Sequence, residues 1–423
     1  MTRIVLVGML GCYALCGFSP QIVILEEPSL ALGRVPSTRE VPFRMTLQRG
    51  ALQTEPFTRD QEHPPSPPQG GNIHLHDSPL EGGQGGVVRY SRSHLQNQSL
   101  TQKGLWIGAD EIAKLPTSGA AWENLLRAAK QPARTPNIFD QEDPTNVLVL
   151  AKALVFARLK EENHRREVVA ALRAVLSTRA QDNARTLALG RELIAYVIAA
   201  DLIDLRKHEP ALEEQFREKL KALRSASFKE RTLISTHEKR ANNWGTHAGA
   251  SRAAIAAYLN EQAELHRCAQ VFRGWLGERE AYSDFKFGKL AWQADSTRPV
   301  GINPKGAQRA GHSLDGVLPE EQRRAGDFAW PPRKENYVYE ALQGALAQAM
   351  ILHRAGYDAW EWSDRAVLRA FEWLYQEAHF PASGDDAWQI HVINHFYHTQ
   401  FPTTRPSLPG KNVGWTDWTH GAH

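Results

Sequence analysis

The chain has 423 residues, of which 42% are apolar and 23% are charged, as in soluble globular proteins that bury a large core. Lys and Arg outnumber Asp and Glu by only 50 to 47, a balance that does not indicate a nucleic-acid-binding protein. Of the three cysteines, Cys12 and Cys16 lie near the N-terminus. Cys268 alone excludes a disulfide framework or a cysteine metal site in the rest of the chain.

The N-terminus has the pattern of an export signal. Arg3 precedes an apolar run over residues 4–18, which Ser19-Pro20 ends. The run is shorter than the ~20 apolar residues of a membrane-spanning helix, and no later stretch is apolar enough to span a bilayer. We expect a signal peptide over residues 1–20 and a periplasmic or secreted protein. The segment 9–12 loosely resembles a lipoprotein cleavage site, so lipid attachment is the alternative.

Residues 21–103 show no sustained helical periodicity and contain a Pro-rich segment at 64–68 and glycine pairs at 70–71 and 82–83. Such a density of glycine and proline predicts a flexible linker or an irregular arm. The character of the sequence changes at Gly104, where helical periodicity begins.

Residues 104–423 are predicted to form one all-α domain. Apolar residues recur there at spacings of three and four, the signature of amphipathic helices, with short connections that favour antiparallel neighbours. A bundle, a solenoid and a closed (α/α) toroid all satisfy this pattern, and the toroid offers a funnel for a chain-like substrate. The apolar stripes cover residues 147–159, 168–175, 187–202, 212–223, 253–276, 338–352 and 366–375.

Two segments, 277–334 and 380–423, break the helical pattern. Long irregular segments inside a compact helical domain are usually functional. The first carries recurring basic residues in a loop rich in glycine and proline, which suits the binding of repeated carboxylates. The second contains a row of histidines at helical spacing, for which a metal site is an alternative. The candidate substrate-binding residues of these segments are Arg298, Lys305, Arg309, His312, His395, Lys411 and Trp415.

The segment 242–252 concentrates polar groups that suit a carboxylate or a developing oxyanion. It contains Asn242, Asn243, Trp244, His247 and Arg252. In a helix, Asn243 and His247 lie four residues apart and share a face. The structural alternative is a histidine satisfied within the core, with the asparagine pair capping the helix.

A further candidate group lies around the start of the predicted helix at 338–352. Asn336 is a plausible N-cap, and Tyr339 lies at the edge of the apolar stripe. Phenol has a reference pKa of about 10, so a tyrosinate base needs positive charge nearby. Arg333 and His247 are candidates to supply it. The alternative is that Tyr339 simply packs between helices.

Taken in order, four motifs resemble the alginate-lyase-like superfamily, and family 38 of the polysaccharide lyases in particular, which includes glucuronan and alginate lyases. They are N-N-W-G-T-H-A-G-A-S-R at 242–252, R-P-V-G-I-N-P at 298–304, D-G-V-L-P-E-E at 315–321 and G-W-T-D-W-T-H at 414–420. The resemblance covers roughly residues 104–423. It implies an (α/α) toroid, an acidic polysaccharide substrate, and β-elimination without a metal or another cofactor.

The resemblance also implies a site of Asn, His, Arg and Tyr, carried over to Asn243, His247, Arg333 and Tyr339. Family five has a histidine directly after its asparagine pair where this chain has tryptophan, so His312 competes with His247. In glucuronate and mannuronate, H5 and O4 lie on one side of the ring, so a single residue can serve as base and then acid. We expect Tyr339 in that role, on glucuronan or mannuronate-rich alginate.

Two alternatives remain at the level of sequence. A glycoside hydrolase on an α/α toroid needs two carboxyl groups across the scissile bond, for which Asp385 or Asp386 with Glu340 are candidates. A non-catalytic binder of acidic polysaccharide would show affinity without turnover. The sequence leaves the oligomeric state open.

Overall fold

A computed structural model describes residues 104–132, 134–180, 184–404, 406 and 409–422. The predicted signal peptide and N-terminal arm lie outside the described residues. Within the described part, no helix is long and apolar enough to cross a membrane.

Four helices are buried on nearly all sides and form the inner layer. Their buried residues lie around the whole helix rather than along one stripe, as expected of helices surrounded by protein. In each of them an almost unbroken run of residues is shielded from solvent. The inner helices are α4 (Thr145–Leu159), α6 (Thr186–Leu202), α10 (Asn243–Tyr258) and α13 (Tyr337–Arg354).

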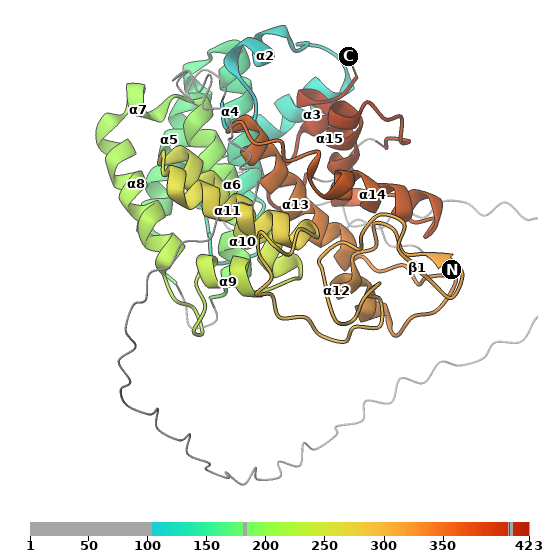
Figure 1. Cartoon of the computed structure of the whole chain (residues 1–423). Helices are drawn as coiled ribbons and strands as arrows, with labels where there is room; N and C mark the ends of the chain where they lie inside the picture. The colour runs from blue at the N-terminus through green and yellow to red at the C-terminus, as the bar shows by residue number, and fades with distance from the viewer. Residues whose placement is uncertain (1–103, 133, 181–183, 405, 407–408, 423) are drawn as a thin grey trace, which may run out of the picture. The chain divides into compact units, whose positions relative to one another are not determined.

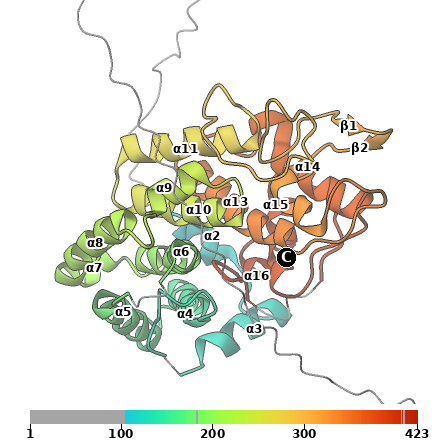
Figure 2. The same ribbon diagram turned by 90° about the horizontal axis from the view of Figure 1, so that it is seen from below.

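Outer helices cover this layer and bury only one stripe each. Their buried residues recur at spacings of three and four, as the sequence predicts for amphipathic helices at a surface. Figure 2 shows them at the periphery, with α6, α10 and α13 further inside. The outer helices are α5 (Glu162–Ser177), α8 (Pro210–Ser225), α11 (Gln262–Leu276) and α14 (Trp362–Gln376).

The packing between helices closes on itself. Successive pairs in the order α4, α6, α10, α13 are in contact, and α13 packs against α15 (Trp388–Tyr397). Helix α15 contacts α16 (Thr416–Thr419), α16 contacts α3 (Ala120–Ala129), and α3 contacts α4 (Figure 1). The all-α prediction is therefore confirmed, and the closed circuit of contacts is the arrangement that an α/α toroid requires.

Helices α10 and α13 approach closely because glycine lies at their contact. A Cβ atom at Gly344 would overlap the backbone of Thr246 and His247, and one at Gly249 would overlap the side chains of Gln348 and His237. The glycines and alanines of segment 242–252 thus allow backbones to pack where larger residues would hold them apart.

The expected single helical segment over residues 253–276 is wrong. Helix α10 ends at Tyr258 and α11 begins at Gln262, because Asn260 adopts a left-handed conformation with φ of 58°. Asparagine is one of the few residues other than glycine that adopts this conformation readily.

Segment 277–334 is largely irregular, as predicted, whereas segment 380–423 also contains α15. The remaining elements are short. They are α2 (Ala109–Lys114), α7 (Leu205–His208), α9 (Leu233–Lys239), β1 (Gln308–Arg309) paired antiparallel with β2 (His312–Ser313), α12 (Pro319–Gln322), and the 3-10 turns η1 (Arg323–Ala325) and η2 (Gly384–Asp386).

Candidate functional site

Polar side chains gather where the first turns of the inner helices come together. Asn146, the second residue of α4, donates from its amide nitrogen to the carbonyl oxygen of Lys411 at 2.9 Å and to that of Arg191 at 3.5 Å. Arg191 belongs to α6, and its guanidinium donates to Glu340 in the first turn of α13. The N-terminal ends of helices carry partial positive charge, so such an arrangement favours an anionic ligand.

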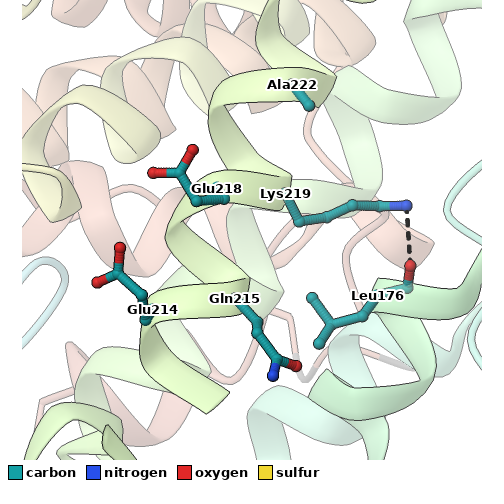
Figure 3. Close-up of a pocket in the computed structure, with 6 residues that line it drawn as sticks. All are labelled: Leu176, Glu214, Gln215, Glu218, Lys219 and Ala222. Carbon is teal, nitrogen blue, oxygen red and sulfur yellow. Dashed lines mark hydrogen bonds between the residues drawn. The ribbon is translucent and has the colours of Figure 1, made fainter. Parts of the chain in front are cut away.

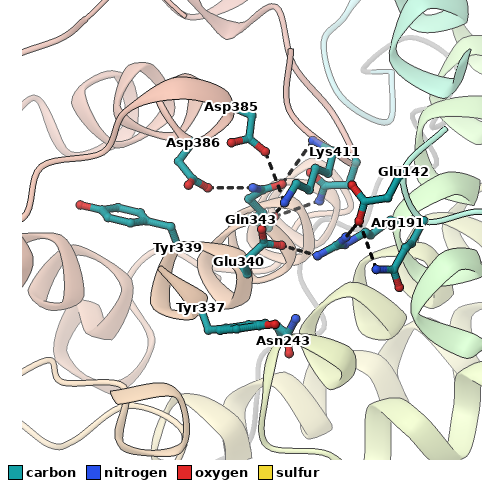
Figure 4. Close-up of polar contacts among 12 residues, drawn as sticks. Glu142, Arg191, Asn243, Tyr337, Tyr339, Glu340, Gln343, Asp385, Asp386 and Lys411 are labelled. Atoms are coloured by element: carbon teal, nitrogen blue, oxygen red, sulfur yellow. Dashed lines mark hydrogen bonds and ion pairs between the residues drawn. The ribbon is translucent and has the colours of Figure 1, made fainter. Parts of the chain in front are cut away.

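An ion-pair cluster occupies the middle of this end; we call Glu142, Arg191, Glu340, Asp385 and Lys411 the Glu340 cluster. The buried carboxylate of Glu340 pairs with both Arg191 and Lys411. Lys411 also reaches Asp385 at 3.5 Å, and Arg191 reaches Glu142 at 3.6 Å (Figure 4). Each cation therefore has carboxylate partners within the protein.

Asp386 lies beside this cluster in a different environment. Its Oδ1 atom accepts hydrogen bonds from Gln343 Nε2 at 2.7 Å and from Gln389 Nε2 at 2.9 Å. Burial is the main cause that raises the pKa of the Asp386 carboxyl to about 7, against the lowering effect of the Gln343 hydrogen bond. Only 3% of the residue is exposed, and its Oδ1 atom is already shared by two amides of the protein.

A second group of polar side chains lies around the first residue of α10; we call Asn243, Glu321, Arg324 and Tyr337 the Tyr337 group. The Arg324 guanidinium carbon lies 3.9 Å from the centre of the Tyr337 ring. Arg324 Nη2 also lies 3.5 Å from Asn243 Oδ1. Arg324 therefore contacts both Tyr337 and Asn243. Tyr337 is 43% exposed. Among the described residues, it is the one large hydrophobic side chain that is exposed.

The side-chain amide of Asn243 carries a hydrogen-bond donor. Its side chain is 1% exposed, and its amide nitrogen has no hydrogen-bond partner among the described residues. A buried donor left unpaired costs about 1–3 kcal/mol. A ligand oxygen that accepts from this nitrogen would recover that free energy.

His247 lies one helical turn further along α10, on the face of Asn243 as predicted. It is fully buried. Burial is the largest cause that holds the pKa of its imidazole well below the usual range, and the charges of Arg191 and Lys411 act in the same direction. His247 is therefore a neutral side chain behind the site surface, rather than a cation at it.

Tyr339 and Arg333 do not join these groups. The Tyr339 hydroxyl donates to the carbonyl oxygen of Phe380, and the residue is 1% exposed. Burial raises the pKa of Tyr339 far above its usual value, which opposes formation of a tyrosinate. Arg333 is exposed, and its guanidinium lies 3.4 Å from the carbonyl oxygen of Ala325. The geometry thus does not support the expected roles of these two residues.

Two predicted substrate-binding residues are structural instead. Arg252 is 2% exposed and forms ion pairs with Glu264 at 2.8 Å and Glu238 at 3.1 Å. Trp415 is 6% exposed, and its indole nitrogen donates to the carbonyl oxygen of Val147 at 2.9 Å. Both side chains are occupied by the protein itself.

Asn242 and Trp244 flank the site residue Asn243. Asn242 is the N-cap of α10, and its buried Oδ1 has no hydrogen-bond partner among the described residues. Trp244 is partly exposed, with the guanidinium carbon of Arg240 at 5.7 Å from its ring.

The basic loop residues lie apart in segment 277–334. Arg298 is exposed and pairs with Glu280 at 3.1 Å, and Lys305 is exposed. Arg309 covers the ring of Phe328 at 5.0 Å, and His312 stacks on Trp330 at 4.3 Å. No contact among the described residues joins them to Asn243.

His395 contacts aromatic side chains rather than the polar groups above. Its ring lies 5.1 Å from that of His420, and burial lowers the pKa of its imidazole. Over the described ranges, no group of three or more His, Cys, Asp and Glu side chains is arranged to hold a metal ion.

An open pocket lies elsewhere, between α5 and α8 (Figure 3). Leu176, Glu214, Glu218 and Lys219 line it, and the Lys219 ammonium donates to the carbonyl oxygen of Leu176 at 3.0 Å. It contains none of the predicted site residues.

A comparison with models of known protein families gives a match. Residues 149–281 match the model of a family described as alginate lyase. The matched region runs from α4 to the segment after α11 and includes Asn243 and His247. It supports an alginate-lyase-like family and polysaccharide lyase activity. No curated protein matches the chain.

Proposed function

We propose that the protein cleaves a 1,4-linked polyuronate, glucuronan or mannuronate-rich alginate, by β-elimination and leaves 4,5-unsaturated uronate ends. One observation carries the proposal: the exposed Tyr337 ring lies against the Arg324 guanidinium, beside an asparagine with a free amide donor. The match to the alginate lyase family model supports the same reaction class.

The first requirement of the reaction is neutralisation of the substrate carboxylate, because its charge opposes removal of the proton on C5. Asn243 Nδ2 donates one hydrogen bond to a carboxylate oxygen, and Arg324 supplies positive charge next to it. Both interactions strengthen as negative charge moves onto the carboxylate in the enolate-like transition state.

The second requirement is a group that takes H5 and returns a proton to O4. We assign both steps to Tyr337, which replaces Tyr339 of the sequence-based expectation. The Arg324 guanidinium carbon lies 3.9 Å from the ring centre, so positive charge is placed against this ring. The electron pair of the C5–H5 bond forms the C4–C5 double bond, and O4 leaves with the proton from Tyr337.

The stereochemistry of this mechanism selects the substrate. In glucuronate and mannuronate, H5 and O4 lie on the same side of the ring, within reach of one phenol. Guluronate is the C5 epimer and needs groups on opposite faces. We therefore expect turnover of glucuronan or polymannuronate in preference to polyguluronate. Export through the signal peptide proposed at residues 1–20, to the periplasm or the medium, would bring the enzyme to such polymers.

The hydrolase alternative is less well supported by the site. Glu340 and Asp385 both pair with Lys411, and Glu340 also pairs with Arg191. Both carboxylates are thus paired with cations of the protein, whereas glycoside hydrolysis needs one carboxylic acid that is free to give its proton to the leaving oxygen. Asp386 is protonated up to about pH 7, but Gln343 and Gln389 both donate to its Oδ1 atom and hold it within the protein.

The test is to mix the purified protein with glucuronan, polymannuronate and polyguluronate and to follow both ultraviolet absorbance of unsaturated uronates and reducing ends, with and without chelator. We expect the two signals to rise together on glucuronan or polymannuronate. Reducing ends without absorbance would indicate hydrolysis, and binding without either signal would indicate a non-catalytic binder.

A further inference from the structure

We infer that Glu321 is a positioning residue that holds Arg324 across the Tyr337 ring and ties both to the start of α10. The inference rests on the proposed function of the Tyr337 group. It concerns a residue that touches neither the substrate nor the reacting atoms, and that acts through two neighbours which do.

The two oxygens of this carboxylate have different partners. Oε1 accepts a hydrogen bond from the backbone N–H of Asn243, the first residue of α10. Oε2 lies 2.7 Å from Arg324 Nε. The carboxylate therefore connects α10 to the turn that follows α12, two segments about 80 residues apart in the sequence.

Arg324 in turn connects Glu321 to the reacting groups. With Nε bound to Glu321, its guanidinium carbon lies 3.9 Å from the Tyr337 ring centre and Nη2 lies 3.5 Å from Asn243 Oδ1. A guanidinium on a long, partly exposed side chain has many rotamers available. Fixing one end of it on a buried carboxylate selects the rotamer that covers the ring.

Burial makes this carboxylate costly to maintain. Glu321 is 1% exposed, and burial raises the pKa of its carboxyl to about 7, although Arg324 and the Asn243 N–H both lower it. An ionisable group at position 321 thus has a local role beyond filling space.

The chain contains a matched control one residue away. Glu320 is 6% exposed and pairs with Arg323, three residues on, just as Glu321 pairs with Arg324. The Glu320 carboxylate accepts from the backbone N–H of Gly288 at 2.9 Å, in the irregular segment rather than in α10. Both glutamates lie in α12, both are buried, and each pairs with the arginine three residues further on. They differ in the backbone N–H that each accepts from, which belongs to Asn243 for Glu321 and to Gly288 for Glu320.

The experiment compares Glu321→Gln with Glu320→Gln in the full-length protein. We expect Glu321→Gln to lower kcat roughly tenfold or more at nearly unchanged KM, because the loss concerns the transition state. Glu320→Gln is expected to change kcat by less than about twofold. Equal losses in the two variants would overturn the inference, since a general effect of removing a buried charge would explain them.

A double-mutant cycle tests whether Glu321 acts through Arg324. Arg324→Ala affects a partly exposed side chain, so this variant is expected to fold even if Glu321→Gln does not. If the inference is correct, Arg324→Ala lowers kcat at least as much as Glu321→Gln, and the double variant is no slower than Arg324→Ala. Wild-type kcat in Arg324→Ala, or fully additive losses, would contradict it.

Crystal structures of the wild type and Glu321→Gln give a readout that does not depend on turnover. We expect the Arg324 guanidinium to leave the Tyr337 ring in the variant. If it stays in place, the inference fails whatever the activity. If it moves but the wild type cleaves no polyuronate, the positioning role stands and the proposed function fails.

Discussion

Tyr337 and Tyr339 lie two residues apart in the first turn of α13, yet their side chains are on opposite sides of the helix. Tyr337 is 43% exposed beside Asn243, whereas Tyr339 is 1% exposed and packs against Phe371 and Phe380. A helix turns by about 100° per residue, so two residues are separated by about 200°. Only one of the two hydroxyls can face a ligand at this end of the helices.

The ion pairs of Arg252 predict an effect on stability rather than on substrate binding. Arg252→Met leaves the carboxylates of Glu238 and Glu264 with fewer partners, and we expect the free energy of unfolding to fall by about 3 kcal/mol. The control is Arg298→Ala, whose ion pair with Glu280 is exposed and should contribute less than about 1 kcal/mol. Denaturant unfolding measures both. A raised KM with wild-type stability in Arg252→Met would restore its predicted substrate-binding role.

The close contact of α10 and α13 predicts that Gly344→Ala is strongly destabilising. The added methyl group would overlap the backbone of Thr246 and His247, which cannot rotate away, so we expect a loss of roughly 3 kcal/mol. At Gly249 the added methyl group meets the ends of the Gln348 and His237 side chains, which can shift. Gly249→Ala should therefore be the milder variant in thermal unfolding, and the reverse order would contradict this description of the contact.

Asp386 predicts a pH dependence of stability. Its pKa is about 7 in the folded protein against a reference value of 3.8, so between these values the folded state holds a proton that the unfolded state has lost. The contribution of Asp386 to stability therefore falls as the pH rises from about 4 to 7. Asp386→Asn does not titrate and keeps an oxygen for Gln343 and Gln389. We expect this variant to gain stability relative to the wild type between pH 5 and about pH 8. A constant difference across that range in thermal unfolding would show that Asp386 does not titrate there.

The sequence was sufficient to predict the helices and part of the site. Apolar spacing located the inner and outer helices except α10, whose first residues lie outside the predicted stripe 253–276 and which ends before α11 begins. The four-residue spacing of Asn243 and His247 places them on one face of α10. Both are local properties, fixed by the geometry of a single helix.

Local spacing could not identify the tyrosine and the arginine of the proposed site. The apolar stripe of α13 leaves Tyr337 and Tyr339 on its two flanks, so periodicity alone does not distinguish them. A signal was present, because Asn336 as N-cap makes Tyr337 the first helical residue, at the exposed end. The pairing of Arg324 with Tyr337 depends on the course of residues 325–336, which no local pattern specifies. The contacts of Arg252 and Trp415 also join separate segments of the chain, so local patterns did not predict them either.

The most direct test of the central claim is turnover of the preferred polyuronate by Tyr337→Phe and Tyr339→Phe, measured side by side with the wild type. We predict that Tyr337→Phe lowers kcat by about 1000-fold or more with little change in stability, because the proton-transfer group is lost. Tyr339→Phe should lose about 1 kcal/mol of stability with its hydrogen bond to Phe380, while the folded enzyme keeps its kcat. The opposite pattern, with an active Tyr337→Phe and an inactive Tyr339→Phe, would contradict this account of the site.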